Sequence, residues 1–293
     1  PRSTQSRSSA ASDVYKRQQQ ARYDSSLLDT DALGAETSAA LRLERNLANG
    51  YVALTLDTSQ RQDDDRNGFG VSRQFLLGSD QVVAGLDWQR ESRETGLMRA
   101  VGQQDAVWLN VSHNFSARDQ LSWALEHRQY ETRSGLSIGS GEVANVEVSQ
   151  VQFFSGPTWI LRSGLEVQNN RLDSTNLTSL LTSNGGVVNQ GDVTAEELLP
   201  DRVGRFYVGS QLRRGYPGAL NRTRGQYTWL LDTAAGWDWV EQSMNYSVNA
   251  GLGVEVLGDD ELSFTAGYQS APIGGDGEPG GNVSISYSSR FGR

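Results

Sequence analysis

The stretch NYSVNAGLGVEVLGDDELSFTAGYQSAPIGGDGEPGGNVSISYSSRFGR, residues 245–293, decides the fold class. Apolar residues alternate with polar or small ones over 246–254, 262–268 and 283–291. This two-residue period is typical of strands with one apolar and one polar face. The Gly and Asp residues at 258–260 supply a tight turn. Because the strands are long and their polar faces are rich in Ser, Thr, Asn and Gly, a transmembrane β-barrel with a wet interior is favoured over a soluble sandwich.

The composition of the chain agrees with a barrel and excludes several other classes. Only 37% of the 293 residues are hydrophobic, and no run approaches the roughly 18 to 20 apolar residues of a spanning helix. A barrel needs no such run, because each strand shows only alternate residues to lipid. Without Cys, disulfides and thiolate sites are excluded. The net charge of -9 argues against nucleic acid as a partner, and we expect no cofactor and no metal.

The opening segment, PRSTQSRSSAASDVYKRQ, has no periodicity and resembles an artefactual leader. We therefore expect a non-native or disordered leader at residues 1–18 and an outer-membrane β-barrel domain at residues 19–293. We also expect the natural protein to continue upstream, so that the lack of a signal peptide here carries no information on location.

Short turns and longer loops alternate along the chain. Short turns are predicted at NLANGY, LLGSDQ, FSARDQ, FSGPTW and VLGDDE, each with Gly, Asn, Asp or Pro. Longer loops are predicted at, among others, SQRQDDDRNGFG, RESRETGLMRAVGQQD, ETRSGLSIGSGE and AAGWDWVEQS. This asymmetry is typical of the periplasmic turns and extracellular loops of outer-membrane barrels. It predicts an all-β, antiparallel up-and-down barrel of about fourteen strands, with one irregular connection, the long basic segment Arg213–Gln226.

The period of two assigns each strand an outer and an inner face. The residues placed outward are Leu41, Leu43, Val52, Leu54, Leu56, Val82, Ala84, Leu86, Trp88, Val107, Leu109, Val111, Leu121, Trp123, Leu125, Val146, Val148, Trp159, Leu161, Leu165, Val167, Phe206, Val208, Tyr227, Trp229 and Leu231. The charged residues placed inward, as candidate pore-lining groups, are the acids Glu44, Asp57, Asp87, Glu126, Glu147, Glu166, Asp232 and Glu255 and the bases Arg42, Arg128, Arg162, Arg205 and Arg290.

These inward charges have two interpretations. An excess of acids in a lumen favours the passage of cationic or neutral polar solutes over anions. Alternatively, the charges pair across strands and only keep the interior wet.

An enzyme on a barrel wall is the rival class. His113 and His127 are the only histidines, and neither has a hydroxyl two residues away on its own strand face. We therefore expect no catalytic residues. The acids Asp63–Asp65, Asp276 and Glu278 lack the spacing of a known calcium loop, so we interpret them as solvated loops.

The longest connection, Arg171–Asp201, interrupts the hairpin pattern with some thirty residues. Structureless loops of that length are uncommon unless they are functional or disordered. Long extracellular loops of barrels can fold inward, so this segment is predicted to cover the pore, with a mobile surface loop as the alternative.

Three segments carry a resemblance to a known family: LLPDRVGRFYVGSQLRRGYPG at 198–218, LGVEVLGDDELSFTAGYQSAPIGGDGEPGG at 252–281 and ISYSSRFGR at 285–293. The sequence resembles, over roughly residues 20–293, the C-terminal outer-membrane barrel of PelB-type exporters of the Pel biofilm polysaccharide. The resemblance implies a sixteen-stranded export pore, an amino-sugar polymer of positive character as substrate, an upstream periplasmic tetratricopeptide scaffold and an export-complex lipoprotein as partners.

The predicted function is therefore that of an outer-membrane pore domain that exports an exopolysaccharide for biofilm formation. A general diffusion porin and a surface-adhesin barrel are the alternatives. An upstream region of helical 34-residue repeats would favour the exporter over a porin.

Overall fold

The structure of the chain is a computed structural model. It describes residues 12–21, 36–61, 64–92, 94, 98, 102–133, 135–153, 157–173, 198–217, 227–257, 260–270 and 280–288. Within these ranges the side chains of residues 12–21, 36–38, 61, 64, 153, 257, 280, 282 and 288 are not described.

The described residues form fourteen β-strands, and each pairs antiparallel with the next one in the chain. The strands are β1 (Ser12–Ala21), β2 (Glu36–Leu47), β3 (Gly50–Arg61), β4 (Asp64–Leu77), β5 (Asp80–Arg90), β6 (Gly102–Asn114), β7 (Asp119–Thr132), β8 (Ser137–Phe153), β9 (Thr158–Leu172), β10 (Arg202–Arg214), β11 (Thr228–Asp238), β12 (Ser243–Leu257), β13 (Asp260–Gln269) and β14 (Gly280–Ser288). The predicted all-β up-and-down architecture and the count of about fourteen are confirmed.

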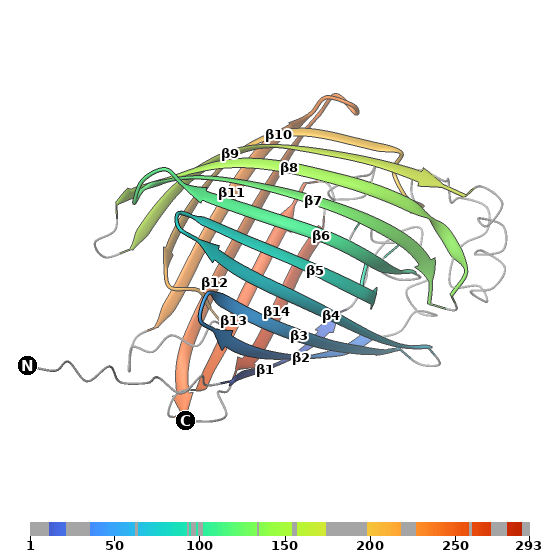
Figure 1. The fold of residues 1–293 in the computed structure, drawn as a ribbon, viewed down its shortest axis with the longest axis horizontal. Coiled ribbons are helices and arrows are strands. Elements are labelled where there is room, and N and C mark those ends of the chain that lie inside the picture. The colour runs from blue at the N-terminus through green and yellow to red at the C-terminus, as the bar shows by residue number, and fades with distance from the viewer. Residues whose placement is uncertain are drawn as a thin grey trace, which may run out of the picture.

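The sheet curves round on itself, so that β1 comes into contact with β14 (Figure 1). Within the described strands, the hydrogen-bonded ladders run in order from β1 to β14, and none joins these two edge strands. The result is a barrel-shaped sheet with a seam between its first and last strands. In the described part of the chain, no helix is long and apolar enough to cross a membrane.

The two faces of the sheet differ in chemistry, because side chains alternate along each strand. Large apolar side chains of the outer face are exposed, as Leu86 (57%), Val107 (57%) and Leu125 (51%) illustrate. Such a continuous apolar outer surface suits lipid rather than water. Other predicted outward residues that are exposed are Val52, Leu56, Trp88, Val146, Val148, Leu161, Leu165, Val167, Phe206, Val208, Tyr227 and Leu231.

Three predicted long loops are instead strand hairpins, and those predictions are wrong. In SQRQDDDRNGFG the strands β3 and β4 continue to Arg61 and from Asp64, which leaves residues 62–63 between them. Likewise β7 and β8 enter ETRSGLSIGSGE, and β11 and β12 enter AAGWDWVEQS. The strand ends were placed where the apolar alternation stops, but backbone pairing needs no apolar side chains and continues where both faces are polar.

Two further segments bear on the predictions. The strand β1 begins at Ser12 and so overlaps the segment 1–18, while the boundary at residue 18 stays a prediction. Of the connection predicted to cover the pore, residues 174–197 lie outside the described residues, but Leu198 and Leu199 are fully buried.

The irregular connection between β10 and β11 begins by turning inward. Gly215 adopts a positive φ of 73°, a conformation that favours glycine. Arg213 stacks over the ring of Tyr216, with its guanidinium carbon 3.8 Å from the ring centre. Pro217 then lies against the inner face of β12. Gly251 on that strand has no Cβ atom, and one added there would lie only 3.0 Å from the ring of Pro217.

Candidate functional site: the inner wall of the barrel

Paired charges cover the inner face of β3, β4 and β5. The carboxylate of Asp57 lies 3.4 Å from Arg66 Nη1 and 3.2 Å from Arg90 Nε. Asp87 binds Arg90 Nη1 at 3.0 Å and accepts a hydrogen bond of 3.0 Å from Trp108 Nε1 on β6. Two acids and two bases therefore neutralise one another across three strands.

A β-bulge brings Arg90 into this cluster. The register between β5 and β6 shifts between Asp87 and Arg90. Within the shift, Gln89 has a φ of +51°, and its backbone N–H donates to Asp105 Oδ1 at 2.7 Å. Leu86 and Trp88 face outward, so strict alternation would also place Arg90 outward. The bulge reverses the direction of its side chain, which is a common role of bulges.

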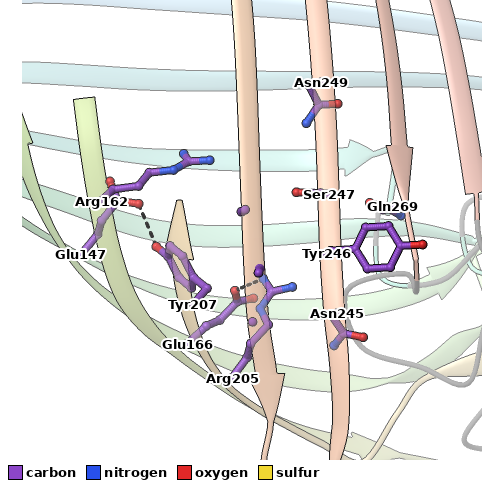
Figure 2. Close-up of a pocket in the computed structure, with 13 residues that line it drawn as sticks. Glu147, Arg162, Glu166, Arg205, Tyr207, Asn245, Tyr246, Ser247, Asn249 and Gln269 are labelled. Atoms are coloured by element: carbon purple, nitrogen blue, oxygen red, sulfur yellow. Dashed lines mark hydrogen bonds and ion pairs between the residues drawn. The ribbon is translucent and has the colours of Figure 1, made fainter. Parts of the chain in front are cut away.

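A second cluster lies on the inner face of β8 to β11 and borders a pocket of about 260 Å³ (Figure 2). Arg205 binds Glu166 at 2.6 Å, and the Tyr207 hydroxyl donates to Glu147 at 2.9 Å. Beside the pocket, Arg162, which also lines it, binds Asp232 at 2.6 Å, and Asp232 further accepts a hydrogen bond from Gln211 at 2.9 Å.

The opposite side of the pocket carries no charge. It is lined by Asn245, Ser247 and Asn249, which follow one another on the inner face of β12, and by Gln269 of β13 (Figure 2). The pocket thus combines two ion pairs and the carboxylate of Glu147, bound by the Tyr207 hydroxyl, on one side with amide and hydroxyl groups on the other.

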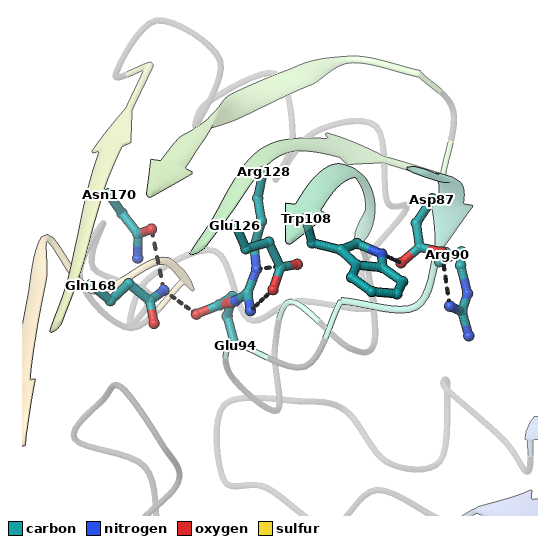
Figure 3. A network of polar contacts seen from close by, with 8 residues as sticks. All are labelled: Asp87, Arg90, Glu94, Trp108, Glu126, Arg128, Gln168 and Asn170. Carbon is teal, nitrogen blue, oxygen red and sulfur yellow. Dashed lines mark hydrogen bonds and ion pairs between the residues drawn. The ribbon is translucent and has the colours of Figure 1, made fainter. Parts of the chain in front are cut away.

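The third cluster links side chains of β7 and β9 to the connection between β5 and β6 (Figure 3). Arg128 on β7 binds Glu126 at 2.8 Å and also contacts Glu94, which lies between β5 and β6. Glu94 in turn contacts Gln168 on β9, whose amide donates to Asn170 Oδ1 at 3.2 Å.

Aromatic side chains of the inner face cover glycines of neighbouring strands. A Cβ atom on Gly85 would lie 2.3 Å from the ring of Trp108, and one on Gly164 would lie 2.5 Å from the ring of Tyr207. The buried Tyr130 likewise lies close to Gly141, since a Cβ atom added to Gly141 would be 3.0 Å from its ring. Glycine at these positions lets the rings lie close to the wall instead of projecting into the interior.

The inward charges predicted from sequence are found on the inner face wherever their side chains are described. Arg42 and Glu44 pair with each other at 3.2 Å on β2. Glu255 lies on the inner face of β12, and Arg290 lies outside the described residues. Arg162 and Arg205 pair with acids of other strands, whereas Arg42 and Arg128 pair with acids of their own strand. Whether they line a conducting path stays a prediction.

Sequence reasoning missed Arg66, Arg90 and Glu94, because all three fall in segments that were predicted as loops. Extending the alternation of β4 from Phe69 and Val71 would have placed Arg66 inward. The bulge that redirects Arg90 has no comparable signal in the sequence.

His113 has neighbours that the spacing along its own strand could not show. Across the β5–β6 ladder, its Nδ1 contacts Asp80 and lies 3.5 Å from Ser79 Oγ. The ring of Phe115 packs edge-on against it, with the ring centres 4.6 Å apart.

With this geometry established, comparison with known proteins defines the family. The model of the PelB C-terminal β-barrel domain matches residues 9–290. The chain belongs to this family. It is therefore an integral outer-membrane β-barrel, and its family and fold support an outer-membrane pore.

One solved structure supports the fold of this PelB-type barrel. A "Bacterial polysaccharide outer membrane secretin" matches with a TM-score of 0.62 and 10% identity, over 96% of this chain and 98% of that one. CdiB from Acinetobacter baumannii, at a TM-score of 0.47 and 10% identity, covers 97% of this chain and 60% of that one. The likeness to CdiB is too weak to carry an argument. No curated protein is similar enough in sequence to count as a match.

Proposed function

We propose that this barrel is the pore through which a polysaccharide leaves the cell for biofilm formation. The observation that carries the proposal is the polar pocket on the inner wall, whose amide and hydroxyl side chains face neutralised ion pairs. Membership of the PelB family supports the same proposal, as does the fold that the chain shares with a bacterial polysaccharide outer membrane secretin.

The lining suits a neutral or weakly charged sugar chain. Sugar hydroxyls both donate and accept hydrogen bonds, and so do the side chains of Asn245, Ser247 and Asn249. Opposite them, Arg162 and Arg205 are paired with carboxylates and Glu147 is bound by a neutral hydroxyl, so only a weak negative field acts on a passing chain. Weak binding at many sites allows a substrate both to enter and to leave, as conduction requires.

The substrate and the partners follow from the family. We propose a Pel-like amino-sugar polymer as the cargo, a periplasmic tetratricopeptide scaffold that delivers it to the barrel, and a lipoprotein of the export complex as a further partner. Outer-membrane lipid covers the apolar outer face, and nucleic acid has no role.

We also propose that the barrel catalyses no reaction. Ser79 and Asp80 both approach the same ring nitrogen of His113, Nδ1. A serine triad needs the hydroxyl on one ring nitrogen and the carboxylate on the other, so this arrangement does not activate a nucleophile.

The test makes the uncharged side of the pocket apolar. In the intact exporter, the triple change Asn245→Leu, Ser247→Leu and Asn249→Leu is expected to reduce secreted polymer and retain it in the periplasm, because sugar hydroxyls lose their partners. The matched control, Val248→Leu with Val254→Leu, alters the exposed outer face of the same strand and is expected to leave export unchanged.

Normal polymer secretion by the triple variant, with the folded barrel present in the outer membrane, contradicts the proposal. If the variant instead loses uptake of small solutes while secretion continues, the barrel acts as a general diffusion porin.

A further inference from the structure

Two arginines lie on the apolar outer face of β2 and β4. The ladders that join β2, β3 and β4 have no register shift, and Val52 on β3 pairs with Arg45 on β2 and with Arg73 on β4. Val52 belongs to the exposed outer face, so both arginines share that face. Their backbones are about 10 Å apart, because neighbouring strands are separated by about 4.8 Å.

Arg73 lies within the apolar outer surface and not beyond its end. Along β4 it stands between Val71 and Phe75, and Leu77 continues the same face towards the turn. The exposed fractions of Val71, Phe75 and Leu77 are 42%, 37% and 57%. A guanidinium group among lipid chains is costly unless it reaches the polar boundary of the membrane.

The side chain of Arg73 extends towards that boundary. Its Nη2 donates to Oδ1 of Asn49, in the turn between β2 and β3, at 2.9 Å. Its guanidinium carbon lies 4.8 Å from the ring centre of Phe75, which is two residues nearer the turn between β4 and β5. The carbonyl oxygen of Asn49 accepts a hydrogen bond of 2.9 Å from the backbone N–H of Leu76, which fixes the turn beside β4. Long basic side chains present their charge at a membrane interface in this way.

The strand connections show which end of the barrel this is. Residues 48–49, 78–79 and 115–118 connect strands at this end, whereas residues 91–101 and 173–201 connect strands at the other. Short turns of outer-membrane barrels face the periplasm, and longer loops face the outside. The two arginines are therefore placed at the inner leaflet, whose phospholipids carry phosphate groups.

The positive charges of Arg45 and Arg73 are not neutralised by the protein. Within the described part of the chain, neither side chain forms an ion pair with a carboxylate. Nη1 of Arg73 is shielded from water and makes no hydrogen bond with the described residues. A donor in this state is costly, so an acceptor from outside the chain would stabilise it.

We propose that Arg45 and Arg73 together bind the phosphate group of an anionic phospholipid of the inner leaflet. The phosphate lies between the two guanidinium groups, over Val52, and Asn49 orients Arg73 towards it. Arginine suits this role because its planar guanidinium group forms paired hydrogen bonds with phosphate. Two unneutralised charges favour a lipid of net negative charge. The site lies on the outer face and does not depend on the proposed pore function.

Native mass spectrometry of the intact exporter in detergent tests the site. The unmodified protein is expected to retain phosphatidylglycerol more tightly than phosphatidylcholine, whose own ammonium group neutralises its phosphate. Arg45→Gln with Arg73→Gln is expected to weaken retention of phosphatidylglycerol by about tenfold or more, because charge-assisted hydrogen bonds to phosphate are lost.

The control variant, Arg202→Gln with Arg214→Gln, also removes two arginines from the outer face. Both share the face of Phe206 and Val208 but lie at opposite ends of β10, so they cannot hold one phosphate between them. Retention of phosphatidylglycerol is expected to stay at the level of the unmodified protein. Compact migration on unheated gels checks that each variant is folded.

Loss of tight phosphatidylglycerol binding in the first variant and not in the control supports the proposal. Equal retention of the two lipids by the unmodified protein would overturn it, as would undiminished binding after Arg45→Gln with Arg73→Gln. An equal loss in both variants would overturn it too, because net charge alone would then explain retention. Displacement of the lipid by inorganic phosphate would show a site for a free ion and would likewise contradict a lipid site.

Discussion

At the scale of single residues, the inner wall is built from charges that neutralise one another. Arg162 is held by Asp232, and Arg205 by Glu166, each at 2.6 Å. Removing one partner leaves the charge of the other unpaired on the inner wall, so we expect the ion selectivity of the proposed pore to depend on each pair remaining complete.

Neutralising the two acids is therefore expected to favour anions. In Asp232→Asn with Glu166→Gln, Arg162 and Arg205 lose their counter-charges, and the reversal potential under a salt gradient is expected to shift toward anion selectivity. The charge-conserving variant Asp232→Glu serves as the control and keeps the original reversal potential. An unshifted potential in the double variant would mean that these groups lie away from the conducting path.

The glycines under the aromatic rings give a second prediction at this scale. A methyl group at Gly164 would meet the ring of Tyr207 at 2.5 Å, and overpacking of this kind typically costs about 1 to 3 kcal/mol. Gly164→Ala is expected to lower the temperature at which the barrel loses its compact migration on gels. Gly281→Ala, where the nearest atom is 3.7 Å away, is expected to change nothing. If Gly164→Ala and Gly281→Ala lose compact migration at the same temperature, the Tyr207 ring can move aside without cost, which contradicts this prediction.

At the scale of strands, the period of two determines which residues meet lipid. Leu125 on β7 is paired with Leu109 and Ala144 on the outer face. Leu125→Arg is expected to cost about 2 to 4 kcal/mol near the bilayer midplane, measured by urea unfolding in lipid vesicles. Asn110→Arg, on the inner face of β6, is expected to be tolerated. Similar losses for both would overturn the assignment of faces.

The alternation of apolar and polar side chains made the fold predictable. Features that break this alternation, or that lie beyond its ends, could not be predicted from it. Leu125 and Glu126 are assigned to opposite faces by period alone, and the structure agrees. The positions of strand ends, such as β3 continuing to Arg61, could not be inferred, because pairing there depends on the backbone. Neither the bulge at Gln89 nor the inward fold at Glu94 has a periodic signal, since each depends on partners far away in sequence.

At the scale of the whole molecule, the fourteen described strands form an apolar outer surface around a polar interior. The pocket between the paired charges of β8 to β11 and the amides of β12 lies on that inner wall. Combined with membership of the PelB family, this arrangement is the basis on which we propose the interior as the path of a polysaccharide.

Blockade of ion current by soluble fragments of the exported polymer tests that path most directly. With the intact exporter in a planar bilayer, the fragments are expected to produce reversible, concentration-dependent interruptions of current. The interruptions are expected to shorten in the variant with Asn245→Leu, Ser247→Leu and Asn249→Leu and to persist with Val248→Leu and Val254→Leu. Open channels whose current is unaffected by the fragments would contradict the account.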